Sequence, residues 1–152
     1  MRTPANIARH PIHPMLVPIP IGLWIFALVC DLVYVFGSGG GAWTTVALYC
    51  MVGGVIGALA AAIFGFVDPL SLPPEPKRIA VWHMAINLTI VVLYVLNVWL
   101  RLTSTEVPRG AIWLSIIAVA LLVVSGWLGG HMVYVHGVAV DTEPTGSSGA
   151  KR

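Results

Sequence analysis

Four long apolar runs dominate the chain, separated by short segments rich in glycine, proline and polar residues. The runs cover residues of about 14–36, 43–67, 79–100 and 111–135. Lys, Arg, Asp and Glu are absent from residues 32–67, 79–100 and 110–140. A helix needs about 20 mostly apolar residues to cross a bilayer, and each run is long enough. The pattern therefore predicts four transmembrane helices that pack as one bundle.

The composition supports the same class of protein. Of 152 residues, 58% are hydrophobic and 9% are charged, whereas a soluble domain carries about 25% charged residues. The first run is too long for the apolar part of a signal peptide and lacks a small-x-small cleavage motif, so we expect it to remain as a helix. We therefore expect an all-α, integral membrane four-helix bundle at residues 14–140, after an N-terminal segment at 1–13 and before a disordered polar tail at 141–152.

The distribution of Lys and Arg predicts the orientation in the membrane. An even number of spans places both termini on one face, which then carries six basic residues: Arg2, Arg9, Lys77, Arg78, Lys151 and Arg152. The opposite face carries two, Arg101 and Arg109. By the positive-inside rule, both termini are expected in the cytoplasm, in a multi-pass protein of the inner membrane. Because the basic residues lie beside the membrane, they do not indicate nucleic-acid binding.

All the histidines fall on the face that is expected to be cytoplasmic. His10 and His13 precede the first run, His83 lies near the start of the third, and His131 and His136 close the fourth. Asp68 ends the second run in the same layer. Every helix thus contributes a potential ligand at one depth. A histidine at a helix end is, however, more often an interfacial hydrogen-bonding residue than a ligand, so the structural alternative stays open.

The first two histidines lie in the stretch HPIHP, residues 10–14. A residue before proline is driven toward extended geometry, and a polyproline helix with a rise of about 3.1 Å per residue would place the two imidazoles about 9 Å apart. That distance is too long for both to bind one ion, so we expect one ligand per centre and favour His13. As an alternative, His13 is the N-cap of the first helix and Pro14 its first residue.

The last two histidines are five residues apart. On a regular helix they would point about 140° from each other. His131 and His136 are therefore expected not to bind one ion together, unless the helix unwinds at Gly129-Gly130 or near Gly137.

Polar residues inside the third run follow one helical stripe: His83, Asn87, Tyr94, Asn97 and Arg101. Such a stripe faces the bundle interior, because hydrocarbon offers it no partner. We expect Asn87 and Tyr94 to support a site near His83, and Arg9, Lys77 or Arg78 to meet the propionates of a haem. Asp31 is expected to pair with Arg101 or Arg109. On the second run, small residues every fourth position predict close approach of another helix or of a flat macrocycle: Gly53, Gly57, Ala61 and Gly65.

Several of these stretches resemble an uncharacterised bacterial family of four-helix membrane proteins, domain of unknown function 2231. The stretches are HPIHP, Gly65-Phe66-Val67-Asp68, Trp82-His83 with Asn87, and the residues from Gly129-Gly130-His131 to Tyr134-Val135-His136-Gly137-Val138. The resemblance spans nearly the whole chain outside the tail. It implies a membrane location, brings no settled activity, and marks as family-like positions His10, His13, Asp68, His83 and His136.

Three functions are compatible with this pattern. The leading hypothesis is a haem b protein that carries electrons in a membrane complex or to a quinone, with these candidate ligands: His13, His83, His136, His10 and His131. The second is a non-haem iron, copper or zinc site with these ligands: His13, His83, His136 and Asp68. The third is an accessory subunit without a cofactor, held in a larger complex or a homo-oligomer. No catalytic residue can be named, and we expect no enzymatic activity from the chain by itself.

Overall fold

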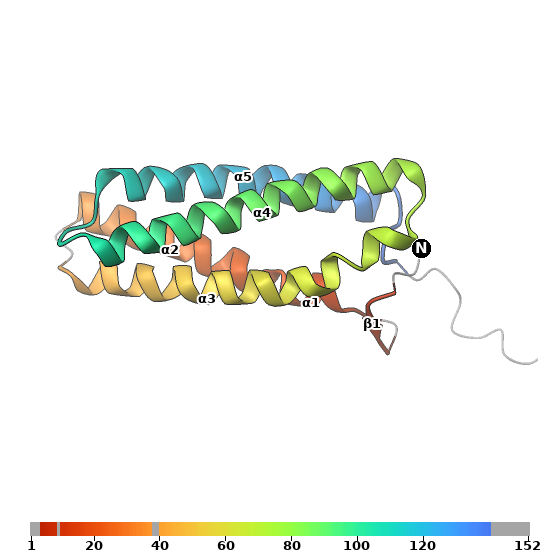
Figure 1. The fold of residues 1–152 in the computed structure, drawn as a ribbon, viewed down its shortest axis with the longest axis horizontal. Coiled ribbons are helices and arrows are strands. Elements are labelled where there is room, and N and C mark those ends of the chain that lie inside the picture. Colours follow the sequence, from red (N-terminus) through yellow and green to blue (C-terminus); the bar gives the residue numbers. More distant parts are fainter. Residues whose placement is uncertain (1–3, 9, 38–39, 141–152) are drawn as a thin grey trace, which may run out of the picture.

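A computed structural model describes residues 4–8, 10–37 and 40–140, in which four long helical segments pack side by side (Figure 1). The helices are α1 Ile12–Leu16, which continues into α2 Pro18–Phe36, then α3 Ala42–Gly65, α4 Pro74–Thr103 and α5 Arg109–Tyr134. The predicted all-α four-helix bundle is confirmed. The predicted disordered tail at 141–152 and the basic residues Arg2, Arg9, Lys151 and Arg152 lie outside the described residues.

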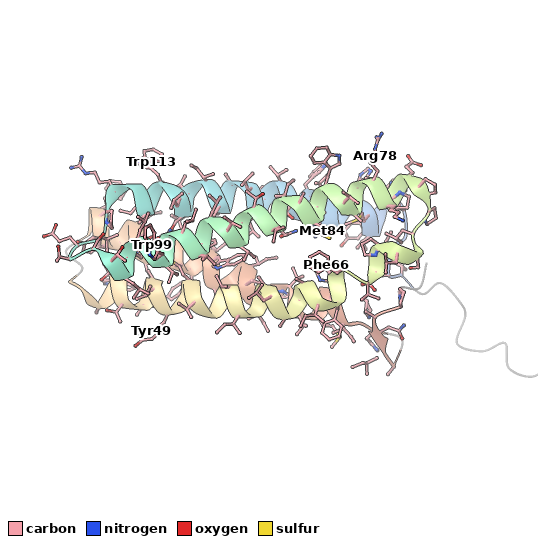
Figure 2. All side chains as sticks on the ribbon, in the orientation of Figure 1. Tyr49, Phe66, Arg78, Met84, Trp99 and Trp113 are labelled. Carbon is pink, nitrogen blue, oxygen red and sulfur yellow. The ribbon has the colours of Figure 1, made fainter. Side chains whose placement is uncertain are left out.

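The bundle is apolar on its outside as well as its inside. Its four helical segments of 25, 30, 30 and 26 residues are long and apolar enough to cross a membrane, and at most 28% of each apolar stretch is buried within the chain. Most of the apolar surface therefore faces outward, where lipid would cover it. Trp99 and Trp113 lie on this outer surface near one end, with Tyr49 on the neighbouring helix (Figure 2). Aromatic side chains at such positions are typical of membrane interfaces.

Smaller elements gather at the opposite end. An antiparallel hairpin joins β1 Asn6–Ile7 to β2 His10–Pro11, and a 3-10 helix, η1 Asp68–Ser71, links α3 to α4. The segment that follows α5 lies at this end too (Figure 1). We call it the hairpin end of the bundle. Its location on the cytoplasmic side of the membrane stays a prediction.

The HPIHP stretch is divided between a short strand and the start of a helix. His10 and Pro11 form β2, Pro11 is the N-cap of α1, and His13 is the second helical residue. The expected polyproline rod is wrong, and so is the alternative of His13 as the N-cap, because the helix begins two residues before Pro14. A proline is accepted in the first turn of a helix, where its missing N–H would have no partner.

The same property of proline extends α4 toward the hairpin end. This helix begins at Pro74, five residues before the start of the expected span. Pro74 and Pro76 both fall in the first turn, where the backbone N–H groups have no partner within the helix. The proline-rich segment that looked like a loop is therefore partly helical, and it lengthens the helix that carries His83.

The middle of the bundle is closed by two stacked aromatic rings. Trp24 of α2 and Tyr94 of α4 have ring centroids 4.5 Å apart and planes 8° apart. The Trp24 indole N–H donates to the carbonyl of Met51 at 3.3 Å, and the Tyr94 hydroxyl donates to the carbonyl of Trp24 at 3.4 Å. Both residues are almost completely buried. This aromatic stack separates the two ends of the bundle interior.

Beyond the stack, away from the hairpin end, lies a buried ion pair. One guanidinium nitrogen of Arg101 donates to both carboxylate oxygens of Asp31, at 2.8 and 2.7 Å. The Ser115 hydroxyl also donates to Asp31, and Arg101 Nε donates to the side-chain oxygen of Asn97. The expected pairing of Asp31 with Arg101 is confirmed, and Arg109 is exposed instead. Among the described residues, Arg101 Nη1 is buried without a hydrogen-bond partner. The other polar atoms of the network satisfy one another, so they can be buried between membrane helices.

Candidate functional site

Two histidines face each other near the hairpin end of the bundle. His13 lies on α1 and His83 lies nine residues after the start of α4. Their ring centroids are 6.4 Å apart, and the ring planes are nearly perpendicular at 89°. The bundle thus brings together two residues that are far apart in sequence and that were both predicted as ligands.

Each of these two rings is fixed by the helix next to it. His13 Nδ1 lies 2.9 Å from the carbonyl oxygen of Ala61 on α3, and His83 Nδ1 lies 2.9 Å from the carbonyl oxygen of Ser125 on α5. A carbonyl oxygen only accepts hydrogen bonds, so Nδ1 must carry the proton in both neutral rings. The lone pair of each ring is then on Nε2, on the side that faces away from the neighbouring helix. This is the arrangement by which histidine ligands are oriented in metal sites.

A glycine on the adjacent helix leaves space for each of the two imidazole rings. A Cβ on Gly65 of α3 would lie 2.8 Å from His13 Nδ1, and a Cβ on Gly129 of α5 would lie 3.4 Å from His83 Cε1. Each glycine is one helical turn beyond the carbonyl that holds the same ring. The small-residue ridge predicted on the second span therefore serves, at Gly65, the approach of an imidazole.

The His83 side has an additional polar network. Asn87 Nδ2 donates to the Ser125 hydroxyl and to the backbone carbonyl of His83, both at 2.7 Å. The Ser125 hydroxyl lies 3.0 Å from His83 Nδ1. These contacts hold the His83 ring and the end of α5 in one position. Asn87 therefore lies beside His83, and its role as the support of a ligand stays a prediction.

A cavity of about 430 Å³ lies beside the two rings. Residues from all four long helical segments and from η1 line it, and the polar ones are His13, Asp68, His83, Asn87 and Ser125. The remaining lining is almost entirely apolar, and it ends at Trp24 of the aromatic stack. A cavity of this size is in the range of sites for small molecules and cofactors.

The cavity reaches the outer surface between α3 and α4. Leu59 and Phe66 of the α3 side and Leu88 of α4 line the cavity, and each is also about half exposed. Phe66 and Met84 lie at the gap between these two helices (Figure 2). Since this face of the bundle is apolar, the opening would face the interior of the bilayer.

Asp68 lies at the edge of the cavity but has a structural partner. Its Oδ1 accepts a hydrogen bond from the backbone N–H of Ala5 at 3.1 Å, and its side chain is largely buried. Ser71 donates to the Asp68 carbonyl at 3.0 Å. Asp68 therefore fastens the N-terminal hairpin to η1, a role that is separate from the predicted one as a metal ligand.

The last two histidines form a second pair outside the cavity. His131 and His136 have ring centroids 5.3 Å apart. They meet because α5 ends at Tyr134 and Gly137 turns the chain with a φ of +62°. The Gly137 amide N–H donates to the Val133 carbonyl, which is the bond of an αL cap, and the Val138 N–H donates to the Met132 carbonyl. The two histidines therefore do not point about 140° apart, as they would on a regular helix. The helix ends before Gly137, which is one of the two places where it was expected to unwind.

The other predicted residues lie away from the cavity. His10 is exposed, and its Nδ1 lies 2.9 Å from the carbonyl oxygen of Ala8. Arg78 points away from the bundle on the outer side of α4 (Figure 2), and Tyr94 belongs to the aromatic stack. Within the described ranges, no group of three or more His, Cys, Asp or Glu side chains would hold a metal ion. The four residues proposed as non-haem ligands do not meet around one point.

Two groups that shape the site were not predicted. The backbone carbonyls of Ala61 and Ser125 hold the two histidine rings, but every residue has a backbone carbonyl, so the residue type does not reveal this contact. Gly129 was noted only as a point where the helix could unwind. In the sequence, the helix that packs against each histidine carries two small residues four positions apart, and this spacing would have indicated where the rings lie.

Together, the fold and the site define a small multi-pass membrane protein, a four-helix bundle with an apolar cavity beside two facing histidines. The chain belongs to the family described as predicted membrane protein DUF2231, whose model matches residues 9–142. No curated protein and no solved structure matches the chain.

Proposed function

We propose that the cavity binds haem b, with His13 and His83 as its two axial ligands, and that the protein carries electrons within the membrane. The observation that carries this proposal is the geometry of the two rings. Both hold their proton on Nδ1 through a backbone carbonyl, so both offer the Nε2 lone pair to the cavity that they line. An axial histidine is a common ligand of haem iron, and in electron-transfer proteins a second protein side chain takes the other axial position.

The separation of the rings fits two ligands on opposite sides of one metal ion. A metal–nitrogen bond of about 2.0–2.1 Å places two imidazole centres about 6 Å apart when they bind from opposite sides, and about 5 Å apart when they bind as tetrahedral neighbours. The observed centroid distance is 6.4 Å. It agrees with opposite ligation, which is the arrangement of axial haem ligands.

The cavity supplies the apolar surface that a macrocycle requires. It is apolar, it is lined by all four helical segments, and it opens toward the bilayer. A lipid-soluble cofactor would therefore enter from the side without crossing a polar surface. A bare metal ion is supported less well, because such sites usually take three or four protein ligands and the described residues provide two imidazoles here.

The test is an optical one. The protein, produced with haem supplied and purified in mild detergent, is expected to show a Soret band and sharp bands in a reduced-minus-oxidised spectrum. His13→Ala and His83→Ala are expected to shift these bands and to lower haem content. His10→Ala and His136→Ala are matched controls, because these histidines lie at the same end but outside the cavity. Elemental analysis accompanies each spectrum. A stoichiometric transition metal without a Soret band, or neither, would refute haem binding.

A further inference from the structure

The two halves of the chain repeat one pattern of burial. Asp31 follows His13 by 18 residues, and Arg101 follows His83 by the same number. Four of the five buried residues of α2, namely Pro20, Trp24, Ala27 and Asp31, have buried counterparts 70 positions later on α4, namely Ile90, Tyr94, Asn97 and Arg101. None of these four pairs shares a residue type, so the repeat is one of position in the fold rather than of sequence.

The second helix of each half follows the same rule with an offset of 64 positions. The buried residues of α3 are Ala47, Met51, Gly54 and Ala61, and their counterparts on α5, all buried, are Ala111, Ser115, Ala118 and Ser125. The smaller offset means that six fewer residues separate equivalent positions of the two helices in the second half, although five residues join the helices in each half. Each half is therefore one helical hairpin, with its helices in the same order and the same direction.

The contacts of the two histidines match when both offsets, 70 positions for the histidines and 64 for their partners, are applied. His13 is held by the carbonyl of Ala61 and lies against Gly65, whereas His83 is held by the carbonyl of Ser125 and lies against Gly129. Ala61 and Ser125 are counterparts, and so are the two glycines. The match extends to the atoms, because Nδ1 is the bonded nitrogen in both rings.

Counterparts also meet each other across the bundle. His13 faces His83, Trp24 stacks on Tyr94, and Asp31 binds Arg101. These pairs lie at three successive levels from the hairpin end to the other end. Pairs of equivalent residues that meet at successive levels define a pseudo-two-fold axis that runs along the bundle, as in membrane proteins built from parallel repeats.

We propose that the chain is a duplicated helical hairpin, and that the ligand of the histidine site lies on its pseudo-two-fold axis, bound by one equivalent imidazole from each half. This inference rests on the proposed haem site and adds its coordination chemistry. With one equivalent imidazole from each half, haem iron would have both axial positions taken by the protein, so O₂ and CO would have no free position. His13 and His83 would then hold an electron carrier rather than a site of oxygen chemistry, with imidazole planes crossed as their rings are at 89°.

The first test uses the haem-loaded full-length protein. The expected result is a low-spin ferric EPR signal of the highly anisotropic type that crossed imidazole planes produce, with no change in the ferrous spectrum under CO. His13→Ala and His83→Ala are each expected to create a CO-binding species, to a similar extent, whereas His136→Ala is not. A haem that is high-spin and binds CO in the unaltered protein would overturn this inference and leave haem binding intact. A protein that binds no haem would fail at the proposed function instead.

The second test examines the duplication without any cofactor. Trp24 lies over Gly54, where a Cβ would be 2.3 Å from its indole nitrogen, and the counterpart of Gly54 is Ala118. Exchanging only the rings, Trp24→Tyr with Tyr94→Trp, is expected to lower the melting temperature in detergent, because the new indole meets the Ala118 methyl group. Adding Gly54→Ala and Ala118→Gly places the glycine opposite the new indole at position 94, as Gly54 lies opposite Trp24 in the unaltered protein. This fourfold variant is expected to regain at least half of the lost melting temperature.

Size-exclusion chromatography decides whether each variant is folded before its melting temperature is compared. A fourfold variant that melts no higher than the ring exchange alone would overturn the proposed equivalence of the two halves. The same outcome is expected if the offsets of 70 and 64 positions are accidental. The result does not depend on haem, so it separates the duplication from the proposed function.

Discussion

Removing Arg101 alone is expected to destabilise the bundle more than almost any other single change. Arg101→Met keeps most of the side-chain volume but deletes the guanidinium. Asp31, which is completely buried, then loses two charge-assisted hydrogen bonds and keeps one from Ser115 at 3.1 Å. Asn97 loses the donor to its side-chain oxygen. A carboxylate without its cation would remain between membrane helices.

The expected magnitude follows from burial of the pair. The Arg101 side chain is 3% exposed and that of Asp31 is 0% exposed, so solvent screens neither. Removing one partner of such a pair costs about 3–5 kcal/mol, whereas replacing both with apolar residues is often neutral. Asp31→Leu with Arg101→Met is therefore expected to be more stable than Arg101→Met alone, although it carries one more substitution.

The measurement is the free energy of unfolding in mixed micelles, followed by circular dichroism as the denaturing detergent increases. Arg109→Met is the matched control, since Arg109 is an exposed arginine near the same end of the bundle, and a change within about 0.5 kcal/mol is expected there. A loss of only about 0.6 kcal/mol for Arg101→Met, the average for one hydrogen bond between membrane helices, would refute the reasoning. It would mean that the charges are not confined in the interior.

Two further predictions concern the hairpin end. Gly65→Ala is expected to cost about 1–3 kcal/mol of stability and to abolish binding of the proposed haem, because the new methyl carbon would lie 2.8 Å from His13 Nδ1 and push the ring off the Ala61 carbonyl. Gly129→Ala is expected to keep binding, because its methyl carbon would lie 3.4 Å from the His83 ring. Equal effects of the two variants on the Soret band would count against this packing. Asp68→Leu removes the acceptor for the Ala5 N–H, so limited proteolysis should cut the N-terminal segment faster, with unchanged cleavage counting against the role given to this carboxylate.

Much of the fold was predictable because the bilayer limits the alternatives. Each apolar run is long enough for one span, and only helices satisfy the backbone within a single span. The pairing of Asp31 with Arg101 was predictable for a related reason. Both residues lie at similar depth near the same end, and a charge at that depth needs a partner.

The site was predictable only in part, because residue type does not determine which side chains meet. His13 and His83 were expected ligands, but their contact depends on how α1 and α4 rotate in the bundle. The second pair, His131 and His136, depends on the left-handed conformation of Gly137, which a helical pattern does not contain. The internal repeat was hidden because the two halves conserve burial and not residue identity.

The aromatic stack of Trp24 and Tyr94 also has an electrical consequence. It confines the cavity to the part of the bundle between the stack and the hairpin end. A charge that moves across the whole membrane exchanges about 2.3 kcal/mol with a potential of 100 mV, but an electron that enters and leaves at one end crosses only a small part of that field. For the proposed haem, electron exchange from that end would therefore be nearly insensitive to the membrane voltage and would not charge the membrane.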